Sequence, residues 1–150
     1  MNKKIKSNNL QDTEILAEFV FNKLNVSEIK YKQYFILLNG PIGSGKTTFT
    51  KMLLKQFNYD KNVSSPTFNI HHQYKVNGIL INHFDFYRLQ DSCQKDELES
   101  FLELCYNSIN IIEWPENILA NLITDKSNII FNIKFSIINE NNRIIEFSEI

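Results

Sequence analysis

The segment that constrains this sequence most is Gly40-Pro41-Ile42-Gly43-Ser44-Gly45-Lys46-Thr47. It matches the pattern G-x-x-x-x-G-K-[ST] at every fixed position, and three of the 4 glycines in the chain lie inside it. A loop of this kind wraps around an anion with its backbone N–H groups pointing inward, and a Cβ at key positions would obstruct the wrap. The spacing predicts a phosphate-binding loop that joins a strand to a helix.

The segments on both sides of the loop fit this arrangement. Residues 34–39 form a short, almost wholly apolar run that is typical of a buried parallel strand, and residues 46–57 show helical spacing. The helix would point its positive end at the anion, Lys46 can reach the β- and γ-phosphates, and the Thr47 hydroxyl is placed to bind Mg²⁺. The residues expected to contact a nucleotide in this stretch are Gly40, Gly43, Ser44, Gly45, Lys46, Thr47 and Thr48.

The remaining patterns alternate between helices and strands. Helices are expected at 10–24, with Asp12 or Thr13 as a cap, at 95–104, and after Pro115 at 116–122; strands are expected at 68–76, 79–86, 109–112, 128–138 and 143–147. Asn77-Gly78 between two of these strands is a hairpin signal, since both residues accept positive φ. We predict an α/β fold, a three-layer P-loop NTPase-type sandwich with a mixed parallel and antiparallel sheet and helices on both faces.

Length and composition exclude several classes of protein. With 150 residues the chain has room for one domain, 1–150, and a net charge of -1 argues against unaided binding of a nucleic acid. The sequence contains no apolar run long enough for a membrane span, and its basic N-terminus lacks the apolar block of a signal peptide. Cys93 and Cys105 have neither the spacing of a metal site nor the density of a disulfide scaffold. A cytoplasmic protein with reduced thiols is the expectation.

Two acids follow runs that read as buried strands. Asp85 comes after Ile79–Phe84 and Glu113 after Ile109–Ile112, so both carboxylates are expected at the carboxyl edge of the sheet, where the phosphate-binding loop also opens. A triphosphate site needs a carboxylate near Mg²⁺ and a group that orients the attacking water. We assign Asp85 to the metal and Glu113 to the water or the metal, roles that could be exchanged. Two solvated acids at strand ends are the alternative.

Other residues near these acids have two interpretations each. Thr67, in Ser65-Pro66-Thr67, could offer its hydroxyl to the metal or the γ-phosphate, or belong to a plain turn. Trp114 could pack over the site or fill core space. His83 lies in an apolar run, which favours a hydrogen-bonded core histidine over a ligand.

Four blocks of the sequence, in order, resemble one family: Gly40–Phe49, Ser-Pro-Thr-Phe at 65–68, His-Phe-Asp-Phe-Tyr-Arg-Leu at 83–89 and Ile-Glu-Trp-Pro-Glu at 112–116. The family is TsaE, also called YjeE, the ATPase subunit of bacterial tRNA threonylcarbamoyladenosine (t6A) biosynthesis. The resemblance runs from about Leu10 to the end of the chain. It implies ATP and Mg²⁺ as cofactors, a TsaB–TsaD transferase complex as partner, and tRNA reached through that complex.

The resemblance also implies roles for single residues. Lys46 and Thr47 match the phosphate and metal residues of the family, and Asp85 and Glu113 match its two functional acids. Thr67 matches the Ser-Pro-Thr loop, Trp114 the Glu-Trp pair, and Thr13 loosely the segment near the adenine. Pro41 stands where the family usually has Asp, and Ser44 where it usually has Ala; Pro41 lacks the N–H that this position could donate.

Three other functions share the phosphate-binding loop. A small P-loop kinase would need several arginines to clamp donor and acceptor phosphates, and this chain has only Arg88 and Arg143. A GTPase would show Asp-x-x-Gly after the loop, which is missing. In a nucleotide-gated binding module, ATP would order residues 65–67 for a partner and hydrolysis would be incidental.

Overall fold

The apolar run ahead of the phosphate-binding loop forms the central strand β2 (Tyr34–Asn39). Tyr34, Ile36 and Leu38 belong to one apolar cluster, and Phe35 and Leu37 belong to the cluster on the opposite face. Because successive side chains of a strand point to opposite faces, this alternation buries the strand from both sides. A run without polar positions is therefore what a central parallel strand requires.

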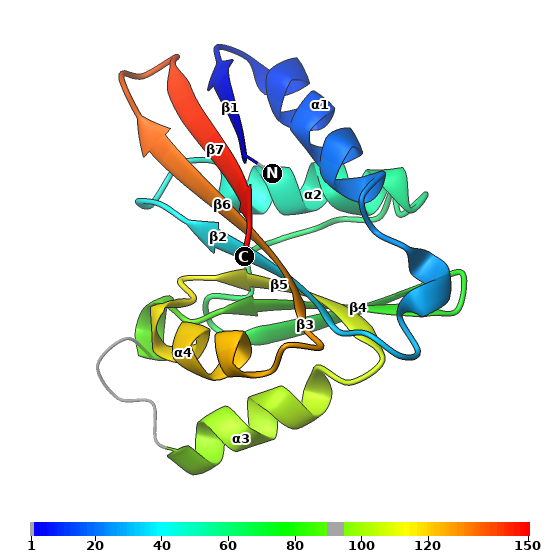
Figure 1. Cartoon of the computed structure of the whole chain (residues 1–150). Helices are drawn as coiled ribbons and strands as arrows, with labels where there is room; N and C mark the ends of the chain where they lie inside the picture. The colour runs from blue at the N-terminus through cyan, green and yellow to red at the C-terminus, as the bar shows by residue number, and fades with distance from the viewer. Residues whose placement is uncertain (1, 90–94) are drawn as a thin grey trace.

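The computed structural model describes residues 2–89 and 95–150, apart from the side chains of 95–98 and 117. Within these ranges the sheet has the order β1-β7-β6-β2-β5-β4-β3 (Figure 1). β2 runs parallel to β5 and β6, and β4 parallel to β5, while the β1/β7, β6/β7 and β3/β4 pairs are antiparallel. The other strands are β1 Asn2–Ser7, β3 His71–Val76, β4 Ile79–Asp85, β5 Ser108–Glu113, β6 Ile129–Ile137 and β7 Arg143–Glu149.

Helices cover both faces of this sheet (Figure 1). The helices are α1 Leu10–Phe21, α2 Lys46–Gln56, α3 Lys95–Leu104 and α4 Glu116–Thr124, with short 3₁₀ helices η1 Val26–Glu28 and η2 Tyr87–Leu89. Leu16 of α1 and Leu53 of α2 belong to the cluster on one face; Phe101 of α3 and Ile118 of α4 belong to the other. The predicted three-layer α/β sandwich with a mixed sheet is confirmed.

The predicted hairpin is present, with a shorter first strand. Val76 pairs with Ile79 around Asn77 and Gly78, whose φ values are 51° and 81°, as a type I′ turn requires. The first strand starts at His71 instead of residue 68, because Ile70 takes a φ of 65° and keeps the preceding residues in a loop. The predicted start of this strand at residue 68 was therefore wrong, and the side chain of Phe68 is 81% exposed in that loop.

The N-terminus differs most from the sequence prediction. Residues 2–7 form β1, an edge strand paired with β7, which the polar sequence Asn-Lys-Lys-Ile-Lys-Ser did not indicate. Lysines are frequent on edge strands because they discourage pairing with another chain. Helix α1 ends at Phe21 instead of residue 24, and its cap is Asn9, with Asp12 as the reciprocal member of a capping box.

Cys105 is buried, and burial raises the pKa of its thiol to about 12. A thiol with so high a pKa is unreactive at neutral pH, which agrees with the predicted reduced, structural role; Cys93 lies outside the described residues. In the described part of the chain, each helix is too short or too polar to cross a membrane.

Candidate nucleotide and metal site

The predicted phosphate-binding loop lies between β2 and α2 and has the backbone of an anion cradle. Gly40, Gly43 and Gly45 all have positive φ, at 143°, 74° and 108°. Gly45 is the N-cap residue of α2 and offers no side-chain acceptor to the first N–H groups of the helix. These N–H groups have no partner within the helix, so they are available to an anion.

Both the limited space around residue 40 and its positive φ require a glycine at this position. A Cβ built on Gly40 would lie 2.5 Å from the carbonyl oxygen of Phe135 in β6, closer than real contacts allow. We therefore expect Gly40→Ala to lower the free energy of unfolding by about 2–3 kcal/mol, through overpacking. Gly43→Ala is the matched control, since nothing lies within 4 Å of its Cβ and only the positive φ opposes it. Urea unfolding with equal losses for both variants would contradict the packing argument.

Lys46 is almost fully buried and folds back over the cradle. Its Nζ donates hydrogen bonds to the carbonyl oxygens of Gly40 (2.8 Å) and Pro41 (3.0 Å), and lies 4.4 Å from the centre of the Trp114 ring. Pro41 lacks an N–H but contributes its carbonyl. Burial lowers the pKa of the Lys46 ammonium, and the nearby Glu113 and Asp85 carboxylates act in the opposite direction.

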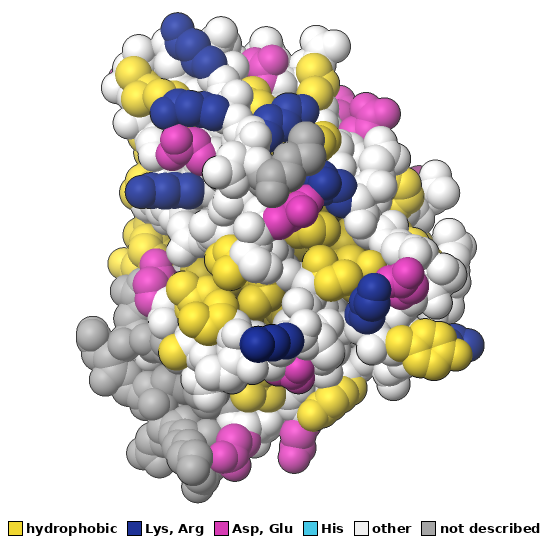
Figure 2. Space-filling model, viewed as in Figure 1, with side chains coloured by type: hydrophobic (Ala, Val, Ile, Leu, Met, Phe, Trp, Pro, Cys, Tyr) yellow, Lys and Arg dark blue, Asp and Glu magenta, His cyan; other side chains and the backbone are white. Residues whose placement is uncertain are grey.

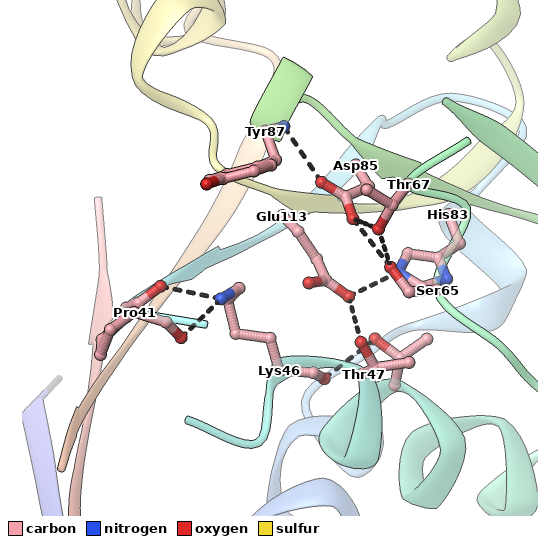
Figure 3. A network of polar contacts seen from close by, with 11 residues as sticks. Pro41, Lys46, Thr47, Ser65, Thr67, His83, Asp85, Tyr87 and Glu113 are labelled. Carbon is pink, nitrogen blue, oxygen red and sulfur yellow. Dashed lines mark hydrogen bonds and ion pairs between the residues drawn. The ribbon is translucent and has the colours of Figure 1, made fainter. Parts of the chain in front are cut away.

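The sheet register brings the two predicted acids together. Asp85 and Glu113 are the last residues of the parallel neighbours β4 and β5, and they are paired with each other. Both are 3% exposed, which excludes the alternative of two solvated acids. Oε1 of Glu113 accepts a hydrogen bond from the Thr47 hydroxyl at 2.9 Å and lies 3.0 Å from Nε2 of His83 (Figure 3).

Asp85 is held by the loop that precedes the hairpin. Its Oδ2 accepts hydrogen bonds from the hydroxyls of Ser65 (2.7 Å) and Thr67, and its Oδ1 accepts one from the backbone N–H of Tyr87 (3.0 Å). Figure 3 shows this group beside Glu113 and Lys46. The Ser-Pro-Thr segment is therefore more than a plain turn, because its hydroxyls lie on one of the two acids.

Trp114 contributes both to the site and to the core. Its ring centroid lies 5.0 Å from that of Tyr87, and the Lys46 ammonium lies over the ring; the residue also packs against the cluster that contains Ile118. Its φ of 58° is rare for a bulky residue. The backbone N–H of Trp114 donates to the carbonyl of Leu38 at 3.2 Å, which ties this strained residue to β2.

A cavity of about 560 Å³ joins these residues. Of the residues predicted from sequence, it is lined by Thr13, Gly43, Ser44, Gly45, Lys46, Thr47, Thr48, Thr67, Asp85, Glu113 and Trp114. Gly40 is not part of the lining and supports the loop from behind. The volume falls within the usual range for small-molecule sites.

Two walls of this cavity were not predicted from the sequence. One is the segment 7–10, from the last residue of β1 to the first of α1; the other is formed by Glu140 and Asn141 in the turn between β6 and β7 and by Arg143 at the start of β7. Arg143 donates a hydrogen bond to the carbonyl of Gly43 at 3.4 Å. Local patterns predicted the elements that flank these residues but not their place at the cradle, because long-range strand pairing brings them there.

The donor set fits Mg²⁺ held with phosphates and does not form a protein cage. Across the described residues, no group of three or more His, Cys, Asp and Glu side chains could hold a metal ion. Magnesium commonly takes only one or two carboxylates from a protein, with phosphate oxygens and waters completing its shell. Thr47 and Glu113 lie within hydrogen-bonding distance of each other at the first turn of α2, where such an ion would meet the phosphates.

Comparison with known proteins finds a family and several relatives that are similar to this chain. The model of the family "Threonylcarbamoyl adenosine biosynthesis protein TsaE" matches residues 7–145. A relative from Rickettsia felis, named tRNA threonylcarbamoyladenosine biosynthesis protein TsaE, is 33% identical over 138 residues, covering 91% of this chain and 74% of the relative. A protein of the same name from Haemophilus influenzae is 37% identical over 107 residues, or 69% of this chain and 65% of that protein.

A solved structure is similar over nearly the whole chain. The crystal structure of YdiB from Bacillus subtilis has a TM-score of 0.65 and 22% sequence identity, covering 99% of this chain and 86% of that one. At this identity the likeness concerns the fold. It supports the three-layer arrangement described above.

Proposed function

Since this chain belongs to the TsaE family, we propose that it is a Mg²⁺-dependent ATPase that supports t6A modification of tRNA by acting with a TsaB–TsaD transferase complex. One observation carries the proposal: the lysine of the cradle, the Thr47 hydroxyl and two buried acids converge on one cavity. Their side chains come from α2, β4 and β5 and meet at the carboxyl edge of the sheet (Figure 3). Parallel α/β sheets bind their ligands at this edge.

Lys46 would exchange carbonyl partners for phosphate oxygens when a nucleotide binds. Its ammonium lies on the Gly40 and Pro41 carbonyls, so a small rotation can bring it to the β- and γ-phosphates while the cradle N–H groups hold the β-phosphate. The ring of Trp114 lies within cation–π distance and restricts where the ammonium can move. The chain would in this way hold the triphosphate at fixed points, which is the main task of a P-loop enzyme.

The contacts favour an exchange of the two acid roles assigned from sequence. Glu113 shares a hydrogen bond with Thr47, the expected Mg²⁺ ligand, so we place Glu113 in the metal shell. Asp85 contacts the hydroxyls of Ser65 and Thr67, so we place it with the groups that orient the water and detect the γ-phosphate. When bound, Mg²⁺ would neutralise charge that develops on the phosphate oxygens.

The positions of the two arginines argue against a kinase. Arg143 lies at the cavity, but the guanidinium of Arg88 lies 4.4 Å from the Phe68 ring and is not part of the lining. One arginine cannot clamp both a donor and an acceptor phosphate group. Hydrolysis is therefore the reaction that these residues support best, with ATP over GTP resting on the family.

The surface charge supports contact with tRNA through partners. On the face seen in Figure 2, lysines and arginines are interspersed with acidic side chains instead of forming one basic surface. With a net charge of -1, the chain would gain little from counterion release on a nucleic acid. We place the protein, as a single domain, in the cytoplasm, where tRNA is modified.

Phosphate release tests the proposal. We expect slow release of phosphate from ATP by the purified chain, dependent on Mg²⁺, and faster release when the TsaB–TsaD complex is added. GTP and a panel of small acceptors serve as controls. Release that depends on an acceptor would identify a kinase, and rates equal with and without the complex would contradict the proposed coupling.

A further inference from the structure

His83 is fully buried, and its imidazole ring contacts Glu113 of the candidate site. It lies on β4 two residues before Asp85, so both side chains point to the face of the sheet that α2 covers. In the sheet register His83 is paired with Ile111, and Asp85 is paired with Glu113. The His83 ring therefore lies two positions before the carboxylates along the strands, on the same face of the sheet. Its Nε2 lies 3.0 Å from Oε1 of Glu113 (Figure 3).

Among the described residues, this contact is the only polar interaction of the His83 side chain, whose backbone is paired in the sheet. Its other ring nitrogen, Nδ1, is buried and has no hydrogen-bond partner among the described residues. The neighbouring Ile81 and Ile111 are fully buried and apolar. An unsatisfied buried polar atom costs about 1–3 kcal/mol, so an apolar side chain would serve stability better at this position. The contact with Glu113 therefore points to a role in the site.

The contact with His83 fixes the orientation of the Glu113 carboxylate. A carboxylate oxygen can only accept, so Nε2 of His83 donates, and Oε1 receives two donors from opposite elements, Thr47 on α2 and His83 on β4. The terminal torsion of a glutamate is otherwise broad. With Oε1 held in this way, Oε2 is the oxygen without a protein donor among the described residues.

We propose that His83 is a positioning residue that holds Glu113 in the orientation needed to bind Mg²⁺ beside Thr47. This inference rests on the proposed function and adds to it a residue that does not itself touch nucleotide or metal. Side chains that orient a metal ligand typically change metal affinity or activity about 10–100-fold when they are lost.

Two amide substitutions separate this role from a structural one. In His83→Gln the amide nitrogen can reach the place of Nε2 and donate to Glu113, whereas in His83→Asn it reaches only the place of Nδ1. His72→Asn, on the strand residue paired with His83, is the matched control. The readouts are calorimetric: ADP binding in EDTA, and Mg²⁺ titrated into the ADP-saturated chain. Phosphate release is measured beside them.

For His83→Asn we expect the Kd for Mg²⁺ to rise roughly tenfold or more and turnover to fall in parallel, with ADP affinity in EDTA unchanged. His83→Gln and His72→Asn should stay close to wild type. Equal Mg²⁺ affinities in the Gln and Asn variants would overturn the inference and leave the proposed function intact. A wild-type chain that binds ADP but releases no phosphate from ATP would instead overturn the proposed function, and the inference with it.

Discussion

Replacing Lys46 by Ala should reduce kcat/KM for ATP hydrolysis about 30-fold to 1,000-fold, which corresponds to about 2–4 kcal/mol of lost transition-state stabilisation. Lys46 is the one cation that the cradle itself supplies, and it lies in a buried position where a charge interacts more strongly than in water. Its ammonium would meet the β- and γ-phosphates as negative charge moves toward the leaving group.

The measurement is steady-state phosphate release, with calorimetric ATP binding beside it. Lys51→Ala is the matched control, because Lys51 lies exposed on the same helix α2 and has no contact with the cavity. Urea unfolding checks that the Lys46 variant keeps its fold after the Gly40 and Pro41 carbonyls lose their partner. A Lys46 variant that retains turnover within threefold of wild type would remove the phosphate cradle from the mechanism.

Glu113→Gln should lower turnover at least a hundredfold and raise the Mg²⁺ concentration that gives half-maximal rate. The amide matches the carboxylate in size and can still accept from the Thr47 hydroxyl, so packing is preserved while the negative charge is lost. Losses of about 10²–10³ in kcat are typical when one group that stabilises transition-state charge is removed. ADP affinity in EDTA should stay near wild type, because Glu113 would act through the metal.

Glu116→Gln is the control for this substitution, since Glu116 lies exposed in the first turn of α4 and its carboxylate also acts on the Lys46 pKa. A general loss of negative charge near Lys46 would affect both variants. Asp85→Asn separates the two acids: it should lower turnover with little change in Mg²⁺ affinity. If Asp85→Asn weakens Mg²⁺ binding and Glu113→Gln does not, the roles assigned from the contacts are reversed.

Local sequence patterns were sufficient to predict the phosphate-binding loop and the strand and helix on either side of it. The roles predicted for the glycines, Lys46 and Thr47 depend on backbone conformation and side-chain reach, which are set by residues a few positions apart. The apolar run before the loop and the helical spacing after it predicted the bounds of β2 and α2 to within one residue. The acids at the ends of β4 and β5 were also predicted, because a strand that is buried on both faces has a recognisable sequence and a definite last residue.

The edge strand and the far walls of the cavity were not predictable in this way. Strand β1 is polar and becomes a strand only because β7 offers it hydrogen bonds. Arg143 reaches Gly43 across 100 residues of sequence, through the pairing of β6 with β2 and β7. Contacts of this kind depend on strand order, about which periodicity carries no information.

By itself, the sequence determined which functional groups the candidate site contains: a phosphate-binding loop, a lysine, a hydroxyl and two acids at strand ends. Only the tertiary structure decided which of these groups contact each other. The placement of β5 beside β2, with β4 beyond it, brings Glu113 to Thr47, 66 residues away, and leaves Asp85 to the Ser65 and Thr67 hydroxyls. The physical reason is that side-chain type and spacing are local properties, whereas the partner of a buried carboxylate is set by the register of strands far apart in the chain.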